Sequence, residues 1–390
     1  MPGNLFRIHV FEVGQGDSIV LETELQGKFF YSIIDCKKVG DKTPVVEFLK
    51  DRKIKNVYSL FITHPHSDHC SGLPHLRDYL KTINGTLEFY ISPILPEENN
   101  LNKRLMELLW NKPLKSKLKD ILNAIIEIKQ LPSQNHSRGR VQSIHTHFEG
   151  DDTPKAWRSH IHPGLLFAPV HPNPSEAIRY LASAIEKGEH EGKFINSLSH
   201  GFMIQVSTLS NKSVSLFVGD LEGRAWRTVK NRCNSITINS VRTNMNFFKV
   251  PHHGARNLVM ENCLRELINT DTPFVASISC PPASDKHPCG ELLEFLKSTF
   301  NKCHIACTNT SGYCHGKGFP SKVMSIFYRT AEEEEFLDFV MSDKQTSLQA
   351  EYVGPCAGTH IFTVTDRGFE LERSSGLPCA FHQTDDRVTF

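Results

Sequence analysis

Four side chains that commonly bind metal ions fall within six residues of the sequence. His64, His66, Asp68 and His69 lie in the run THPHSDHCSG, directly after the apolar stretch NVYSLFIT. The apolar stretch predicts a buried strand and residues 72–80 predict the start of a helix, so the four side chains occupy the loop between them. Such a loop can turn imidazole and carboxylate groups inward, and these groups suit Zn²⁺, Mn²⁺ or iron. A loop with incidental histidines is the alternative, and the density of ligand types argues against it.

The spacing allows two metal ions to share this loop. His64 and His66 would bind one ion, and Asp68 and His69 would bind the other. Two divalent metal ions, Zn²⁺ or Mn²⁺, are therefore the expected cofactors. When bound, such metals lower the pKa of a bridging water to about 7, which gives a hydroxide nucleophile near neutral pH. These residues indicate hydrolysis, and they say less about the substrate.

The histidine run and five further segments of the sequence resemble those of a known protein family. The run THPHSDHCSG is similar to the signature of the metallo-β-lactamase superfamily. With VGQGDSIVLE, SIIDC, SLFVGDLE, FFKVPHHGA and VASISCPPASDKHP, it resembles the soluble hydrolase domain of the ComEC DNA-uptake proteins over most of residues 5–315. The resemblance implies a metallo-β-lactamase αββα sandwich, an α/β fold in which two sheets lie between helical layers.

The resemblance also implies roles for residues after the later strands. Asp220 would bridge both metals, and His253 would close the second metal site. His252 would then bond the leaving oxygen or a non-bridging oxygen of the substrate, although the two histidines can exchange these roles. His287 either donates a proton or hydrogen bond to the leaving group or is a loop histidine. The expected catalytic group is Asp68, which is also a metal ligand, with His252 and His287.

Several neighbouring charged residues have two interpretations each. Asp35, at the end of YSIIDC, would hold a ligand histidine in the right tautomer, or it is a turn residue. Asp17, in GQGDS, serves the loop near the site or caps its own turn. Lys249 and Arg256 flank the histidine pair and face either a phosphate or solvent.

The third ligand of the first metal is where the sequence departs from the family pattern. Many members carry Gly-His-Thr before the strand pair that leads to the bridging aspartate, and this chain has no such run. His171 follows the strand LLFAPV, where the ligand is expected, and is the preferred candidate. His200, which stands 20 residues before Asp220, is the second. A first metal site that is open and binds metal more weakly is the third possibility.

The bulk composition is that of a globular protein. Hydrophobic residues make up 39% of the 390 residues and charged residues 22%, which predicts a sizeable core. The formal net charge of +1 gives no global attraction to nucleic acid or to a membrane, although a local basic patch is compatible with it. Neither a signal peptide nor a membrane span is expected. Several of the 11 cysteines lie in apolar runs, which indicates reduced, buried thiols and a cytoplasmic protein.

The elements that must position the site form one predicted domain over residues 1–390. Residues 6–36 predict a β-meander, and later apolar runs predict strands that alternate with helices. Residues 97–160 are polar and Lys-rich with helical periodicity, which predicts a mainly helical insertion. The insertion would bind a protein partner or a nucleic-acid backbone, or form a solvated lid. Residues 320–390 are a C-terminal β extension, in which GTHIFTVTDRGFELERS predicts a hairpin.

The ComEC-like motifs favour phosphodiester substrates. A nuclease or nucleotide phosphodiesterase is therefore the first hypothesis, with a nucleic acid or nucleotide as partner. No membrane channel is expected in this chain, so a role in DNA uptake by itself is not expected; free-standing relatives suggest an antiviral defence or signalling setting. The alternative is a small-molecule hydrolase that acts on a lactone, a phosphoester or a cyclic nucleotide. A binding module with a degenerate site is disfavoured because the ligand set is complete.

Overall fold

The computed structural model describes most of the segments that carry the motifs. The described residues are 5–83, 88–91, 124, 127–128, 148–149, 153–154, 157–158, 165–173, 176–177, 196–207, 212–235, 245–281, 287–308, 358–365, 368–373 and 387–389. Most of the expected insertion at 97–160 and most of the expected extension at 320–390 lie outside these residues.

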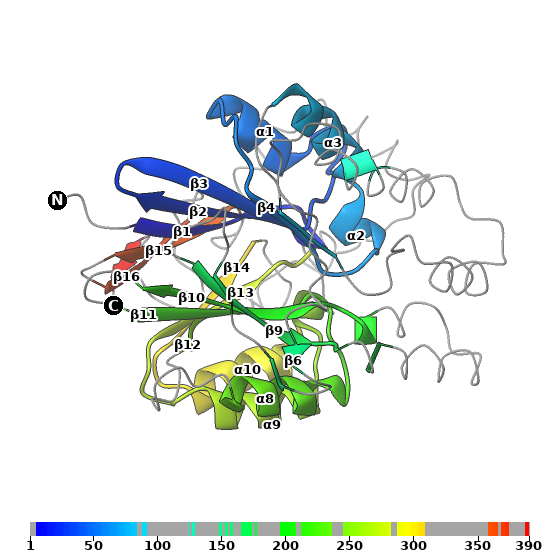
Figure 1. Cartoon of the computed structure of the whole chain (residues 1–390). Helices are drawn as coiled ribbons and strands as arrows, with labels where there is room; N and C mark the ends of the chain where they lie inside the picture. Colours follow the sequence, from blue (N-terminus) through cyan, green and yellow to red (C-terminus); the bar gives the residue numbers. More distant parts are fainter. Residues whose placement is uncertain are drawn as a thin grey trace, which may run out of the picture.

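Two β-sheets face each other at the centre of the molecule (Figure 1). The first sheet has eight strands, which are, in spatial order, β17 (Arg387–Thr389), β16 (Gly368–Arg373), β15 (His360–Thr365), β1 (Leu5–Val10), β2 (Ile19–Leu25), β3 (Lys28–Ile34), β4 (Ser59–Ile62) and β5 (Glu88–Ile91). The second sheet has seven, which are β14 (Cys303–Cys307), β13 (Phe274–Ile278), β12 (Met245–Lys249), β11 (Lys212–Phe217), β10 (Gly201–Ser207), β9 (Leu165–His171) and β8 (Trp157–Arg158). A separate pair joins β6 (Phe148–Glu149) to β7 (Thr153–Pro154).

Helices cover the outer face of each sheet (Figure 1). The first sheet is covered by α1 (Pro44–Asp51) and α3 (Leu73–Thr82), with the short α2 (Ser67–Cys70) at its end. The second sheet is covered by α8 (Ala225–Ser235), α9 (Leu258–Leu267) and α10 (Gly290–Thr299). The predicted αββα sandwich is therefore confirmed. Among the described residues, no helix combines the length and the apolar composition needed to cross a membrane, and the cysteines are free thiols.

Hydrophobic side chains form three layers that match this sandwich. The middle layer fills the space between the sheets, and alternate residues of β1 supply Phe6, Ile8 and Val10 to it, as the two-residue period of a strand requires. Aromatic rings bridge the sheets, and the ring centroids of Phe61 and Phe202 are 4.6 Å apart. Two outer layers lie between the sheets and their helices. The core thus holds the two halves face to face.

The predicted C-terminal hairpin is also confirmed. Strands β15 and β16 pair antiparallel, with Thr365 opposite Gly368. The structure adds that β15 pairs with β1, with Val10 opposite His360, so the last strands of the chain complete the first sheet.

The chemistry-bearing residues lie at one edge of the sandwich. Strands β3, β4 and β5 run parallel in the first sheet, and β11 to β14 run parallel in the second. In open α/β sheets, ligands bind beyond the carboxyl ends of such strands. The motif loops follow β3, β4, β11 and β12, so the fold brings them to a common edge.

Candidate metal centre

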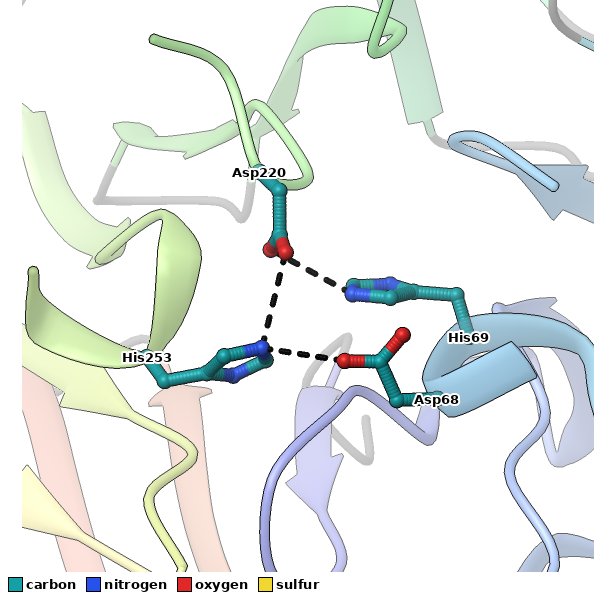
Figure 2. A group of neighbouring side chains, drawn as sticks. All are labelled: Asp68, His69, Asp220 and His253. Carbon is teal, nitrogen blue, oxygen red and sulfur yellow. Dashed lines mark hydrogen bonds and ion pairs between the residues drawn. The ribbon is translucent and has the colours of Figure 1, made fainter. Parts of the chain in front are cut away.

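Three loops from the two halves of the protein meet at one cluster of side chains (Figure 2). Asp68 and His69 come from α2, which follows β4 in the first sheet. Asp220 follows β11, and His253 follows β12, both in the second sheet. Figure 2 shows the four side chains pointing toward a common centre, and one potential ligand atom of each lies within 4.8 Å of those of the others.

Asp220 occupies the middle of this cluster. Its Oδ1 lies 3.3 Å from Nε2 of His69, and its Oδ2 lies 3.4 Å from Nε2 of His253. The Oδ2 atom also lies 3.9 Å from Nε2 of His64. One carboxylate therefore faces histidines from both halves, which is the geometry that a bridging ligand needs.

His64 and His66 face each other beside Asp220. Nε2 of His64 lies 3.1 Å from Nδ1 of His66. His64 is fully buried, whereas His66 is half-buried. Together with Asp220, these two ring nitrogens form a second group of potential ligands next to the first.

Both groups have the spacing of a metal-binding site. Two ligands of a tetrahedral Zn²⁺, each about 2.0–2.1 Å from the ion, are about 3.3 Å apart. The His64–His66 nitrogens are 3.1 Å apart, and Oδ2 of Asp68 lies 3.2 Å from Nε2 of His253. The nitrogen and oxygen donors also suit zinc or manganese. The residues present therefore fit divalent metal ions.

The charges of the buried carboxylates also favour bound cations at this site. Asp17, Asp35 and Asp220 are almost fully buried, and Asp68 is 22% exposed. Nζ of Lys249 lies 2.8 Å from Oδ1 of Asp17 and neutralises that carboxylate. Positive charge must balance the remaining three, because buried carboxylates are stable only when they are paired. Protonated histidines or bound cations supply it.

A hydrogen-bond relay below the cluster sets the tautomers of the ligand histidines. Asp35 accepts hydrogen bonds from the backbone N–H of Thr63 at 2.8 Å, from the Thr63 hydroxyl at 2.6 Å and from Nδ1 of His69 at 2.7 Å. The Thr63 hydroxyl in turn can accept from Nδ1 of His64 at 3.1 Å. Nδ1 of His253 can donate to the carbonyl oxygen of Ser279 at 3.2 Å. With Nδ1 of His64 and His69 protonated toward these oxygens, Nε2 of each ring is the atom available to a metal ion.

The carboxylates also shift the pKa values of the cluster in the metal-free protein. Burial opposes the charged form of His253, but Asp220 outweighs it and raises the pKa to about 9. The pKa of His69 is likewise raised well above its usual value, against its burial, by Asp220 and Asp35. The pKa of His64 is lowered by burial and by the nearby charge of His69. A metal ion must therefore displace protons from His69 and His253 when it binds.

Two glycines allow the loops to approach this closely. Gly16 has φ of +116°, and a Cβ there would lie 2.0 Å from the carbonyl oxygen of Asp68. Gly219, with φ of +53°, precedes Asp220, and a Cβ there would lie 2.8 Å from Cβ of Thr63. Any side chain at either position would collide with the loop opposite, so both glycines are required for the packing.

The second histidine of the pair lies on the rim of the cluster. Nδ1 of His252 makes a close contact with Oε1 of Glu222, and the two side chains are 31% and 27% exposed. Glu222 also accepts a hydrogen bond from Nδ2 of Asn196 at 3.2 Å. The ring of His287 stacks near that of His252, with centroids 6.0 Å apart. The structure thus brings His252 and His287 together beside the buried ligands.

The two candidates for a third ligand of the first metal occupy different settings. Nε2 of His171 lies 2.9 Å from the carbonyl oxygen of Ser197, and its Nδ1 faces Glu176 at 3.8 Å. Glu176 is held in turn by Arg232 at 2.7 Å. Both ring nitrogens of His171 therefore face groups outside the cluster. The backbone of His200, by contrast, donates to the carbonyl oxygen of Thr63 at 2.9 Å, which places it beside His64.

Lys249 and Asp17 form an ion pair with each other beneath the metal cluster. Lys249 is almost fully buried, so it faces Asp17 and not a substrate. The backbone N–H of Asp17 donates to the carbonyl oxygen of Asp68 at 3.2 Å. The Asp17–Lys249 pair thus braces the loop beneath Asp68.

Sequence reasoning missed three polar residues of the site, which are Thr63, Asn196 and Glu222. Thr63 is the last residue of the apolar run NVYSLFIT, and no sequence pattern marks its hydroxyl as part of a site. Glu222 was visible in the run SLFVGDLE, two positions after Asp220. The signal that identifies it is this proximity to a ligand at a strand end.

Comparisons with known proteins identify the family to which the chain belongs. Residues 34–267 match the family model of the metallo-beta-lactamase superfamily, which is more than half of the chain. The protein belongs to this superfamily, whose members are metal-dependent hydrolases. No curated protein matches the chain.

Several solved structures show a distant similarity. The metallo-beta-lactamase fold protein YhfI from Bacillus subtilis is 10% identical with a TM-score of 0.39, covering 77% of this chain and 96% of its own. A diphosphatase from the PhnP family is 11% identical with a TM-score of 0.35, covering 78% and 94%. The dizinc quorum-quenching lactonase AidC is 10% identical with a TM-score of 0.30, covering 60% and 74%.

Proposed function

We propose that this protein is a di-metal phosphodiesterase that acts on nucleic acid or nucleotides. The position of Asp220 carries the proposal. Its carboxylate is buried between His69 and His253 and lies 3.9 Å from His64. A single anion so placed can serve two adjacent cations, which lie about 3.5–4 Å apart in two-metal hydrolases.

Each residue has a distinct task in this proposal. The metal ligands are His64, His66, Asp68, His69, Asp220 and His253, with His171 or His200 as a further ligand of the first ion. Zinc or manganese, when bound, would supply a hydroxide nucleophile and polarise the phosphoryl group. His252 would bond the leaving oxygen or a non-bridging oxygen from the rim, where Glu222 orients it. His287, whose ring lies beside that of His252, would donate a proton or a hydrogen bond to the leaving group.

The segments shared with ComEC-like proteins support a phosphodiester substrate. Gly16 and Asp17 lie against Asp68, Asp35 holds His69, and His287 lies beside His252. Motifs that are far apart in the sequence therefore converge on one centre. The metallo-β-lactamase fold alone serves many kinds of hydrolase and would not require all of these motifs.

A substrate panel with an Asp220 variant tests the proposal. The protein reconstituted with Zn²⁺ or Mn²⁺ should hydrolyse at least one of single-stranded DNA, double-stranded DNA, RNA, cyclic dinucleotides and bis-p-nitrophenyl phosphate. Asp220→Asn should lower kcat by about 100-fold or more, because it removes a charge at the reacting centre. The matched control is Asp41→Asn, at a fully exposed carboxylate, which should keep wild-type activity. Circular dichroism checks the fold of both variants.

Two results would count against the proposal. Hydrolysis of no phosphodiester by the metal-loaded protein would exclude the phosphodiesterase. Full activity in a folded Asp220→Asn variant would exclude Asp220 from the reacting centre.

A small-molecule hydrolase is the second candidate. The net charge of +1 does not favour a long polyanion, and an apolar cleft lies beside His252. Salt distinguishes the two candidates, because binding of a polyanion weakens steeply with salt concentration whereas turnover of a small neutral substrate does not. Hydrolysis of an acyl lactone at a rate insensitive to salt would favour this candidate.

A further inference from the structure

A cleft of about 670 Å³ opens beside the rim of the metal centre. This volume is within the range of about 300–1,000 Å³ that small-molecule sites occupy. The lining residues are Leu221, Glu222, Gly223, Pro251, His252, Ala255, Arg256, Asn257, Leu258 and Val259. His252 and Glu222 therefore belong to both the rim and the cleft, so a group bound in the cleft would adjoin the reacting centre.

The walls of the cleft are largely apolar. Leu258 is 58% exposed, the highest value among the three exposed large hydrophobic side chains of the described residues. At Gly223, the position of a Cβ has no other atom within 4 Å, so this wall faces open space. An exposed apolar surface in a recess favours a flat, uncharged group over water.

Arg256 supplies a cation to this otherwise apolar cleft. Its guanidinium contacts Glu291 at 3.4 Å, and the two side chains are 48% and 57% exposed. A surface ion pair of this kind contributes little stability, so the guanidinium can turn to an incoming anion at little cost. The two polar rim residues are already paired with each other, since His252 contacts Glu222. Arg256 is therefore the group in the cleft that suits a phosphate, which guanidinium groups bind through paired hydrogen bonds.

We propose that this cleft binds the nucleoside next to the scissile phosphate, with its base against Leu258 and the adjacent phosphate on Arg256. The proposal rests on the phosphodiesterase function proposed above and extends it to the substrate. A nucleoside combines an apolar, planar base with a neighbouring anion, and the cleft offers the complementary pair of surfaces. The cleft thus selects an oligonucleotide over a minimal phosphodiester.

The kinetics of two substrates test this subsite. Arg256→Glu and Leu258→Asp should each lower kcat/KM for a short oligonucleotide by about 10- to 100-fold, the effect of losing a charge-assisted contact or of placing a carboxylate against the base. Most of the change should be in KM. Bis-p-nitrophenyl phosphate has neither a nucleoside nor a second phosphate, and its kcat/KM should change by less than about twofold in Arg256→Glu, because the metal centre is untouched.

Arg265→Glu is the matched control. Arg265 lies in the last turn of α9, packs over the ring of Phe295, and is not among the residues that line the cleft. The same reversal of charge, nine positions further along the chain and inside α9, should leave the kinetics for both substrates close to those of the wild type. Equal losses in Arg256→Glu and Arg265→Glu would overturn the proposal, because the effect would then be one of general charge.

A binding measurement separates failure of the subsite from failure of the proposed function. Fluorescence anisotropy of a labelled oligonucleotide should show weaker binding to Arg256→Glu than to Arg265→Glu, whether or not hydrolysis occurs. If the wild type hydrolyses oligonucleotides and the cleft variants behave as the control does, the subsite is wrong and the phosphodiesterase stands. If the protein instead hydrolyses an acyl lactone at a rate that depends on Leu258 and not on Arg256, the nucleoside assignment is overturned.

Discussion

At the scale of single residues, Asp220 and the histidines around it define what the site can bind. The Asp220 oxygens lie 3.3–3.9 Å from the Nε2 atoms of three histidines, so the carboxylate attracts protonated rings in the metal-free protein. The same contacts mean that protons and metals compete for the same nitrogens. Metal affinity must therefore depend on pH.

Metal binding is expected to release protons near neutral pH. The pKa of His253 is raised to about 9 in the metal-free protein, against burial and mainly by Asp220, so at pH 7.5 both nitrogens of this ring carry a proton. Coordination through Nε2 displaces the proton on that nitrogen. Because one proton competes with the metal, the affinity for Zn²⁺ should fall about tenfold for each pH unit below 9.

Calorimetric titration of Zn²⁺ in buffers of different ionisation enthalpy measures the protons released. His253→Ala should release fewer protons than the wild type at pH 7.5, and the difference should shrink above pH 9. Equal release in both proteins at pH 7.5 would show that His253 is not the site of exchange.

The sequence made some of these residues predictable and hid others. His64, His66, Asp68 and His69 are adjacent in the sequence, so their type and spacing were sufficient to propose a metal site. Asp220 and His253 required the family resemblance, because a lone aspartate or histidine after a strand has no distinctive pattern. Thr63 and Glu222 act through contacts that exist only after folding.

At the scale of secondary structure, each loop of the site is held by the element that precedes it. Strand β9 ends at His171, whose ring lies between Ser197 and the pair formed by Glu176 and Arg232. Arg232 belongs to α8 and also donates to the carbonyl oxygen of Val170 at 3.1 Å. The network joins the end of β9 to the helix that covers the second sheet.

His171→Ala is therefore expected to weaken the fold more than the metal site. The loss of a buried hydrogen bond should lower the free energy of unfolding by about 1–3 kcal/mol. Metal stoichiometry, measured by competition with a chromophoric chelator, should remain at two ions per chain.

His200→Ala provides the comparison, and it should lose one ion or bind it more weakly if His200 is the third ligand. Retained stability with loss of one ion in His171→Ala would assign that role to His171 instead.

The strands were predictable to within a few residues because their apolar residues alternate or run continuously, as in the segments of β1, β4 and β12. The hairpin of β15 and β16 was predictable from its turn. Its place beside β1 was not, because long-range packing decides which strand pairs with a hairpin, and this choice leaves no local pattern in either segment. The tight approach of Gly16 to Asp68 is equally invisible before the fold is known.

At the scale of the whole molecule, the metal centre joins the two halves of the sandwich. His64 and His69 follow a strand of the first sheet, whereas Asp220 and His253 follow strands of the second. Bound ions would therefore cross-link parts of the chain that separate on unfolding, and the metal should stabilise the native state by mass action.

Zinc is expected to raise the free energy of unfolding by about 2.7 kcal/mol when its concentration is 100 times the Kd, and by about 4.1 kcal/mol at 1,000 times. Denaturant unfolding at increasing Zn²⁺ concentration measures this gain. Asp220→Asn should show a much smaller gain at the same concentrations, because it removes the ligand shared between the halves. A full gain in that variant would place the bound zinc elsewhere.

The pairing of β1 with β15 has a consequence for how the protein is made. Val10 lies opposite His360, so 350 residues separate two neighbours in one sheet. At a synthesis rate of about 5–20 residues per second, β1 waits roughly 20–70 s after it emerges before its partner strand exists. During that interval one edge of an apolar strand is open to pairing with other chains. Until the last strands are made, the edge of β1 that pairs with β15 therefore has no partner from its own chain.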